Sequence, residues 1–394
     1  MTRMTSFYCI PAKASGAVRW CLVLVAMVST GAAHAQEAGW EFGGDLRGGF
    51  YASERDSRSG FESSDESLRG RFRLFAQREL SDNWLFRGRV ATWVTTDGND
   101  YSLEFDRYRA SGTGTRPGEV HLDEFFFQWA DDADRNTVRI GRFQTGFKLP
   151  VVPDKSLDRN DASNVGIGWT DGVHWISELG GGWESHVIAQ LNHRRGTGNT
   201  FRGPIDFSDS GSRLGAYLGL RSTESWGPVS MRMLTLNWIP DALATHGVAD
   251  PRRDDYLTMT AKAAAEWPVG EAGTRFVLAG EYGHAFDTPK ESVMLIGTPG
   301  DDVDGDGYQL SANLFDIRPG HNLGVVYGHV ESGWLISNDF RNNNDLYEIR
   351  YQHHFNQQLR VDIRFRIREE IEQRIAASQL QEDRDLYVRF TYKL

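Results

Sequence analysis

Arg360-Val-Asp-Ile-Arg-Phe-Arg-Ile-Arg368 alternates polar and apolar residues without a break. The same period of two runs through Leu68–Gln77, Trp84–Val90 and the final segment Leu386–Leu394. Successive side chains of a strand point to opposite faces, so each segment has one largely apolar and one largely polar face. The alternation predicts a protein built from amphipathic β-strands.

The connections between the segments distinguish a soluble β-sandwich from a membrane barrel. Connections of a few residues alternate strictly with long ones, such as 53–66, 96–117 and 149–166. Short turns at one end and long loops at the other are typical of outer-membrane barrels, whereas a sandwich has no reason to sort its connections. We therefore predict an all-β protein, a closed antiparallel barrel of 16 transmembrane strands. The expected strands are 40–52, 67–80, 84–95, 118–130, 137–148, 167–177, 183–194, 213–223, 227–238, 255–267, 274–287, 307–317, 322–331, 343–355, 358–370 and 384–394.

Residues 1–35 have the pattern of a secretory signal peptide. Three basic residues precede the apolar run Cys21–Val28, and Ala33-His-Ala35 fits a cleavage site. The run is shorter than the roughly 18 residues that a membrane anchor needs. Both cysteines of the chain lie in this segment, so we expect residues 36–394 to form a single transmembrane β-barrel domain without disulfides.

The charge balance excludes one broad class of function. The chain carries 43 Lys and Arg against 54 Asp and Glu, a formal charge of −11, and removal of residues 1–35 would make it −14 because three basic residues are lost. An acidic chain argues against nucleic-acid binding. No H-E-x-x-H or G-x-S-x-G signature is present, so we expect no enzyme activity.

Two local segments and the overall pattern carry a family resemblance. The last strand, with apolar residues at every second position up to Leu394, resembles the strand that the outer-membrane assembly machinery recognises in Gram-negative barrels. The 16 expected strands and the long third loop look like those of bacterial porins. Leu122–Trp129 and Val138–Phe147 also resemble the phosphate-selective porin O/P group. The resemblance implies an outer-membrane homotrimer whose third loop folds into the barrel and narrows it.

A basic wall is expected inside the barrel. If every strand turns its apolar face outward, the charged residues of the first three and last three strands point inward. These six strands become neighbours when the barrel closes. Like charges in such a stack persist only where water, counterions or acids screen them. The wall comprises thirteen residues: Arg47, Arg69, Arg71, Arg73, Arg87, Arg89, Arg350, Arg360, Arg364, Arg366, Arg368, Arg389 and Lys393.

The third loop supplies the candidate constriction. It begins Leu149-Pro-Val-Val-Pro153, and the two prolines stiffen it. We expect three of its acids to face the arginines across the pore, with two basic residues among them. In the phosphate-selective group, a row of arginines on the barrel wall and lysines of the loop bind anions. This loop has few basic residues, so the resemblance does not imply phosphate specificity for this chain. The charged residues are Asp154, Lys155, Asp158, Arg159 and Asp161.

One loop resembles half of a calcium site. Asp302-Val-Asp304-Gly-Asp306 matches the front of a calcium-binding loop, but position twelve is Asn313 and no helical pattern flanks it. Calcium is the only cofactor that the sequence suggests. Acids of the long loops are candidates for bridging lipopolysaccharide through divalent ions.

The sequence thus favours a passive porin of the bacterial outer membrane for small hydrophilic solutes, with mild anion preference. One alternative is a barrel channel for an acidic polysaccharide, of the alginate-export type, which also has a basic lumen but usually more strands. A soluble β-sandwich is the third hypothesis. The sequence names no solute.

Overall fold

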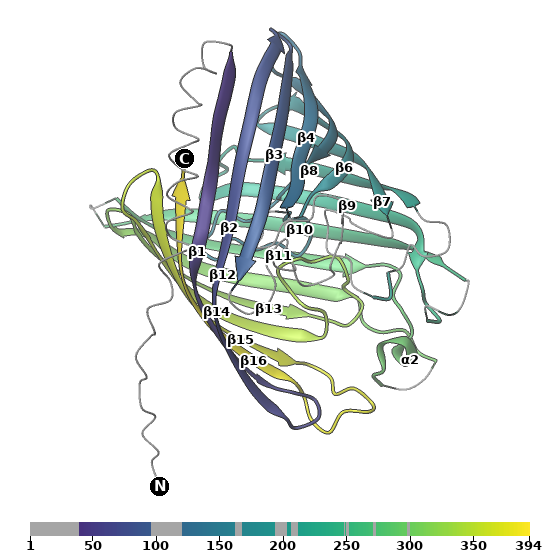
Figure 1. The fold of residues 1–394 in the computed structure, drawn as a ribbon. Helices are drawn as coiled ribbons and strands as arrows, with labels where there is room; N and C mark the ends of the chain where they lie inside the picture. Colours follow the sequence, from purple (N-terminus) through teal and green to yellow (C-terminus); the bar gives the residue numbers. More distant parts are fainter. Residues whose placement is uncertain are drawn as a thin grey trace.

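The computed structural model describes residues 39–95, 120–161, 168–193, 203–205, 212–247, 249, 252–270, 273–297 and 300–394. Sixteen antiparallel strands form one closed barrel in which each strand pairs with its neighbours in sequence (Figure 1). The expected fold is confirmed, whereas the expected signal peptide lies outside the described residues. No helix in these ranges is long and apolar enough to cross a membrane. The strands are β1(Trp40–Asp56), β2(Glu62–Ser81), β3(Trp84–Thr95), β4(Val120–Ala130), β5(Asn136–Phe143), β6(Thr170–Gly180), β7(Trp183–His193), β8(Ser212–Ser222), β9(Val229–Leu243), β10(Asp254–Val269), β11(Thr274–Ala285), β12(Asp306–Arg318), β13(His321–Val330), β14(Asn344–His354), β15(Leu359–Glu370) and β16(Glu382–Lys393).

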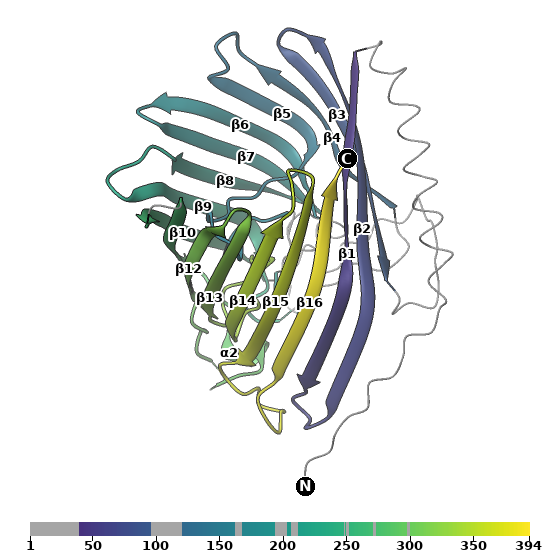
Figure 2. The same cartoon turned by 90° about the vertical axis from the view of Figure 1, so that its left-hand side faces the viewer.

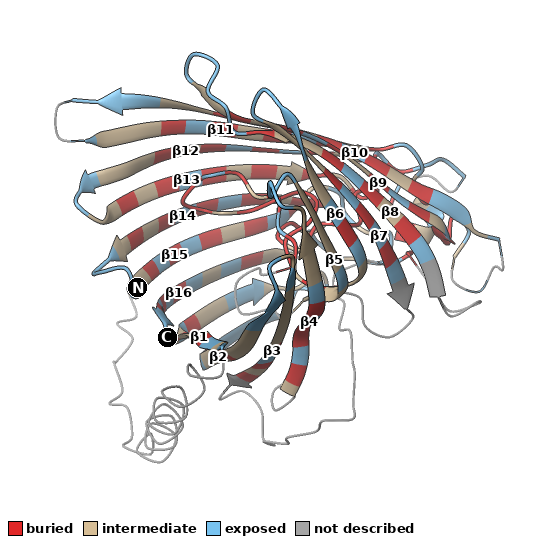
Figure 3. Cartoon of the chain, turned by 90° about the horizontal axis from the view of Figure 1, so that it is seen from above, coloured by how far each residue is buried: buried red, intermediate tan, exposed pale blue. Residues whose placement is uncertain are grey.

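The alternation seen in the sequence separates an outer apolar face from an inner polar face. On β15, Ile363 and Phe365 are exposed by 41% and 44%, whereas Arg364 between them is exposed by only 3%. Figure 3 shows the same alternation of buried and exposed positions along many strands. The outer face therefore presents large apolar side chains to its surroundings, as a lipid-facing barrel does.

The barrel closes between its first and last strands. β1 pairs with β16 from Asp45 opposite Lys393 to Asp56 opposite Glu382, and the two strands lie side by side in Figure 2. This pairing leaves neither terminal strand with a free edge.

The first hairpin differs from the expected boundaries. The sequence predicts a long connection over residues 53–66, but β1 and β2 stay paired as far as Asp56 opposite Glu62, which leaves a turn of residues 57–61. The outer ends of these strands carry polar residues on both faces, so they give no apolar alternation by which a strand is recognised in sequence. The other connections at this end are long, and we call it the long-loop end.

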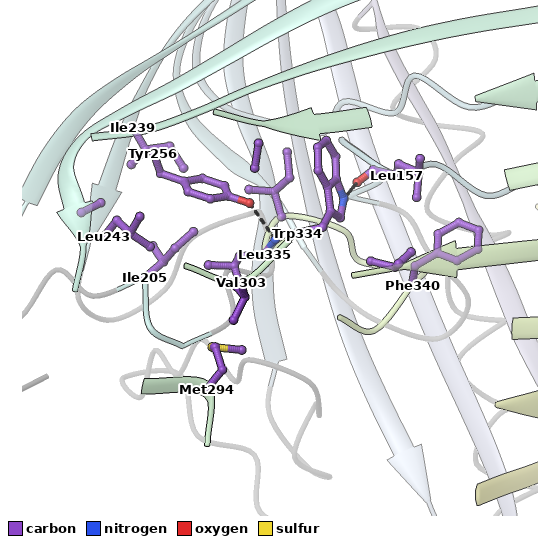
Figure 4. Packing of buried hydrophobic residues seen from close by; sticks show 14 of the residues in the cluster. Leu157, Ile205, Ile239, Leu243, Tyr256, Met294, Val303, Trp334, Leu335 and Phe340 are labelled. Carbon is purple, nitrogen blue, oxygen red and sulfur yellow. Dashed lines mark hydrogen bonds between the residues drawn. The ribbon is translucent and has the colours of Figure 1, made fainter. Parts of the chain in front are cut away.

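The long connections pack together around a core of their own. Trp334 donates from Nε1 to the carbonyl oxygen of Leu157 at 2.9 Å, and the Tyr256 hydroxyl accepts from the Leu335 amide at 2.8 Å (Figure 4). Leu157 follows β5, Tyr256 lies on β10, and Trp334 and Leu335 follow β13. The only helix in the described ranges, α2(Glu291–Met294), contributes the buried Met294 to the same cluster.

A first prediction tests the outer face. Phe390 and Tyr392 on β16 are exposed by 42% and 37% on the apolar side. Replacing both with Asp places charge against hydrocarbon, at a cost of about 2 kcal/mol or more each near mid-bilayer and less near the interface. In detergent gels, a folded barrel migrates faster unheated than boiled. We expect this band to be weak for the double variant, and Phe390→Leu, the control, to give the band of the parent. Normal levels of the double variant would contradict the lipid-facing assignment.

Candidate functional site

The expected basic wall is assembled by the closure of the barrel. The inward positions of β14, β15, β16, β1, β2 and β3 carry all thirteen residues, and the register places Arg350 opposite Arg364 and Arg47 opposite Arg71. Most of these side chains are buried; Arg71, for example, has no exposed surface. Arginines from both ends of the chain thus share one surface.

Acidic residues interleave with the arginines and neutralise part of the wall. Arg71 Nη2 donates to Asp45 at 3.0 Å, and Arg350 Nη2 donates to Glu348 at 2.6 Å. Asp385, which the sequence reasoning did not place on the wall, binds both Arg364 and Arg366. Opposite charges in register explain how so many guanidinium groups remain closely packed.

A β-bulge brings two consecutive acids to the inner side, where strict alternation would place only one. The β3–β4 register shifts between Arg89 and Val90, so the consecutive residues Asp123 and Glu124 of β4 are both buried on the inner side. Arg89 donates to both oxygens of Asp123, at 3.0 and 2.9 Å, and Arg73 Nε lies 3.2 Å from the same carboxylate. Two adjacent acids in an otherwise alternating strand are the sequence signal of this bulge.

Two tyrosines lie at the centre of the wall. The Tyr387 ring is contacted by the guanidinium carbons of Arg364 at 4.0 Å and Arg389 at 4.8 Å. Tyr51 from β1 packs on Tyr387 with a ring separation of 5.3 Å. These are cation–π contacts, which hold a cation without neutralising it.

Some buried donors of the wall have no protein acceptor. Among the described residues, Nη1 of Arg364, Nε of Arg368 and the hydroxyl group of Tyr387 have no protein hydrogen-bond partner. Unsatisfied buried donors are costly, so this part of the wall favours an acceptor from solution. An anion supplies both the acceptor atoms and the missing negative charge.

The start of the third long connection reaches the wall with only two of its charged residues. Arg350 Nη1 donates to Asp154 at 3.1 Å, and Lys155 Nζ lies 3.1 Å from Glu348. The side chain of Asn313 on β12 accepts from the Val152 amide at 3.0 Å. The segment therefore contacts the inner sides of β12 and β14.

The other three charged residues of this connection do not face the arginines, contrary to expectation. Asp158 lies 3.2 Å from Lys262 Nζ on β10, and it also accepts from the hydroxyl group of Thr235 at 2.9 Å. Lys262 in turn lies 2.9 Å from Glu281 on β11. Because the segment turns after Lys155, its second half is directed at β6–β11 rather than at the wall.

Arg159 and Asp161 form hydrogen bonds with residues at the two ends of the connection and with β7. Arg159 donates to Gln190 and Thr170, at 2.5 and 2.7 Å, and Asp161 accepts from the amide and hydroxyl groups of Thr145 at 2.9 and 3.0 Å. Spacing in sequence could not show these contacts, since Thr170 and Gln190 lie on β6 and β7 and Thr145 lies at the other end of the connection.

Burial changes the acid–base behaviour of two residues in this segment. It raises the pKa of the Asp161 carboxyl to about 6, although Arg159 and the bonds from Thr145 and Thr170 oppose the shift. It also lowers the pKa of the Lys155 ammonium to about 8, although the neighbouring Glu348 carboxylate favours the charged form. Asp161 is therefore a group that titrates near neutral pH.

A second loop, which the sequence reasoning missed, fixes the third connection. Asp339, in the connection after β13, accepts from the Ser156 amide at 3.0 Å and from the Asn160 side chain at 2.6 Å. The Ser337 hydroxyl group donates to the Ser156 carbonyl oxygen at 2.9 Å. The run Trp334-Leu-Ile336, apolar within a long loop, was the available signal that this connection is buried.

The three aspartates of the calcium-like stretch have separate surroundings. Asp302 pairs with Lys290 at 2.7 Å, whereas Asp306 accepts from the Tyr282 hydroxyl group at 2.8 Å; Asp304 accepts the Gly333 amide at its backbone carbonyl. In the part of the chain that the structure describes, no group of three or more His, Cys, Asp or Glu is placed to hold a metal ion.

Comparisons with known proteins identify the fold. No family model and no curated protein match the sequence. Similar solved structures include OprB of Pseudomonas putida (TM-score 0.60, 92% of this chain and 96% of that chain covered), the outer membrane channel DcaP of Acinetobacter baumannii (0.53, 90% and 97%) and an anion-selective porin of Comamonas acidovorans (0.51, 90% and 99%), each with 12% identity. At this identity the likeness shows the fold, the closed 16-stranded barrel of porins.

Removal of the Asp158 carboxylate tests how the third connection is held. Asp158→Ala leaves Lys262 with Glu281 as its remaining ion-pair partner, and breaking a buried pair costs about 3–5 kcal/mol. We expect larger and noisier single-channel conductance in a planar bilayer. Asp302→Ala, which breaks an exposed loop pair, is the control and should not change it. If Asp158→Ala has the conductance of the parent, the ion pair between Asp158 and Lys262 does not determine the conductance of the channel.

Acid should stabilise the segment through Asp161. Its folded-state pKa of about 6 lies above the unfolded value of 3.8, so its contribution to stability is fully present below pH 4 and is lost as the pH rises through 6. The difference is at most about 3 kcal/mol. Asp161→Asn should reduce the pH dependence of the temperature at which the barrel unfolds in detergent. The measurement runs from about pH 3.5 to about pH 7, a range that includes both pKa values, 3.8 and about 6. An unchanged pH dependence would assign the titration to another group.

Proposed function

We propose that the chain is a porin of the bacterial outer membrane, a passive channel for small hydrophilic solutes with a mild preference for anions. The observation that carries this proposal is the closed 16-stranded barrel with an apolar outer face and an arginine-lined inner face. An apolar exterior suits lipid, and a charged interior suits water and ions. We assign no catalytic role, and two of the similar structures reported above are named as a porin and an outer membrane channel.

Local charge supports anion preference although the chain as a whole is acidic. Permeating ions respond to charges within about one Debye length, roughly 8 Å in physiological salt. The inner positions of these strands and of β4 hold the thirteen basic residues of the wall, Arg55 and eleven acidic residues. The bulge at Asp123 and Glu124 lowers the excess that strict alternation predicts. The preference should therefore be mild and strongest at low salt. The acids are Glu41, Asp45, Asp65, Glu79, Asp123, Glu124, Glu348, Asp362, Glu370, Asp383 and Asp385.

We infer that the segment after β5 forms the constriction. Its contacts reach β14 through Lys155 and β10 through Asp158, and a segment held on both sides reduces the free cross-section. Asp154 beside Arg350 brings a negative group to the wall, so the narrow region carries opposite charges close together. Such a transverse field favours dipolar hydrophilic solutes over large apolar ones.

The strand number favours this function over a polysaccharide channel, which usually has more strands.

We further propose that the protein works as a homotrimer and that loop acids contact lipopolysaccharide through divalent ions. Chemical cross-linking in membranes tests the first of these proposals.

Substitution of the β2 arginines tests selectivity. Arg69, Arg71 and Arg73 point inward from one strand, and changing all three to Gln removes three positive charges from the wall. We expect the reversal potential in a salt gradient to move toward cations while conductance stays measurable.

The control for this experiment is on the same strand. Arg78 points outward and lies over the Trp40 ring, so Arg78→Gln should leave the reversal potential unchanged. A clearly cation-selective parent channel at about 0.1 M salt, or a triple variant with the parent's reversal potential, would refute the role of the wall.

A further inference from the structure

The long-loop end contains an open cavity of about 630 Å³. Five connections contribute residues to its lining, those that follow β7, β9, β11, β13 and β15. Because β7 and β15 are eight strands apart in a ring of sixteen, connections that start on opposite sides of the barrel meet at this cavity. The cavity therefore lies over the opening of the barrel, where a solute that enters from this end arrives first.

Backbone hydrogen bonds hold the connections around the cavity together. The Ala244 amide donates to the Pro204 carbonyl oxygen at 3.1 Å, which joins the connections after β7 and β9. The Ile375 amide donates to the Leu295 carbonyl oxygen at 2.7 Å, which joins the connections after β11 and β15. Met294 lines the cavity and also belongs to the buried cluster of Figure 4. The cavity is thus a part of the packed loops.

The lining of the cavity is polar and carries one permanent positive charge. Of the described residues that line it, none is acidic, and Arg374 is the one that stays charged at physiological pH. Ser292, His246 and Asn342 add a hydroxyl, an imidazole and an amide group. In a chain with a formal charge of −11, a cavity lined in this way is suited to an anion.

Arg374 has hydrogen-bond donors to spare. Its Nη1 donates to the Met294 carbonyl oxygen at 3.2 Å, whereas Nε and Nη2 form no hydrogen bond with any described residue. The Glu370 carboxylate lies 3.8 Å from Nε, and it already accepts from Arg58 Nε at 2.8 Å. Two guanidinium groups therefore share one carboxylate, which leaves positive charge beside the cavity. A carboxylate ligand supplies both the acceptor atoms and the opposite charge.

We propose that this cavity binds small hydroxylated carboxylates, such as sugar acids, before they enter the barrel. The carboxylate lies against the Arg374 guanidinium, and the hydroxyl groups form hydrogen bonds with Ser292, His246 and Asn342. One cation beside three neutral polar groups suits a single negative charge with several hydroxyl groups, whereas a dianion needs a second cation. The proposal deepens the proposed function, and it rests on that function in taking the long-loop end as an entrance.

Methyl NMR of the full-length barrel in detergent, with isotope-labelled methionine methyl groups, tests the site directly. Met294 lines the cavity, whereas Met231 and Met233 are buried inside the barrel and Met259 is exposed on its outer face. Gluconate should shift the Met294 resonance, assigned with Met294→Leu, and leave the other three in place. Sorbitol, which offers similar hydroxyl groups without a carboxylate, should shift none of them.

Two variants and a control locate the binding. Arg374→Gln should weaken the affinity for gluconate, read from Met294, about tenfold, because a charge-assisted pair is lost. Ser292→Trp, which fills the cavity, should abolish the response. Arg384→Gln is the matched control, since Arg384 lies at the same end of the barrel on β16 and pairs with Glu382 outside the cavity. This control should keep the affinity of the parent.

Three outcomes would overturn the proposal: parent affinity in Arg374→Gln, a sorbitol response equal to that of gluconate, or a gluconate response at Met231 and Met233 without one at Met294. If Arg374→Gln does not fold, Ser292→Trp decides the outcome, because Ser292 is exposed. Conductance measured on the same preparations separates the two proposals. A barrel without conductance whose Met294 still responds refutes the channel and keeps the site, whereas a conducting barrel whose Met294 does not respond refutes the site alone.

Discussion

The pairing of β1 with β16 is the interaction on which the rest of the structure depends. An open sheet with an apolar face would leave a row of unpaired amide and carbonyl groups at each edge, and in hydrocarbon such groups find no substitute partner. Twelve residue pairs close this edge, from Asp45 with Lys393 to Asp56 with Glu382. The same closure brings arginines from the two ends of the sequence onto one inner wall, so fold and candidate site have one physical origin.

The arginine wall exists because carboxylates are distributed through it. Burying a charge without a partner is far more costly than burying an ion pair. Asp123, which has no exposed surface, forms ion pairs with both Arg73 and Arg89. Asp385 forms ion pairs with Arg364 and Arg366. Some donors of the wall, such as Arg364 Nη1, have no protein acceptor. The carboxylates thus neutralise part of the wall, and the anion preference proposed above depends on the positive charge that they leave.

The buried loops are held by charges as well as by apolar contacts. Lys262 lies between Asp158 and Glu281, and none of the three side chains has more than 1% of its surface exposed. Asp339 couples the connection after β13 to the one after β5. The connection after β5 is therefore bonded both to strands β10 and β11 and to the connection after β13.

The sequence by itself determined the strands, their number and the side of each strand that is polar. Alternation in Arg360–Arg368 and Leu386–Leu394 was sufficient, because a strand has only two faces and a barrel leaves only two environments for them. The tertiary structure alone decided which charges meet. The bulge at Asp123 and Glu124 breaks the period of two, and Asp158 finds Lys262 more than one hundred residues away. Such partners are set by strand register and loop path, which depend on long-range packing that no local spacing records.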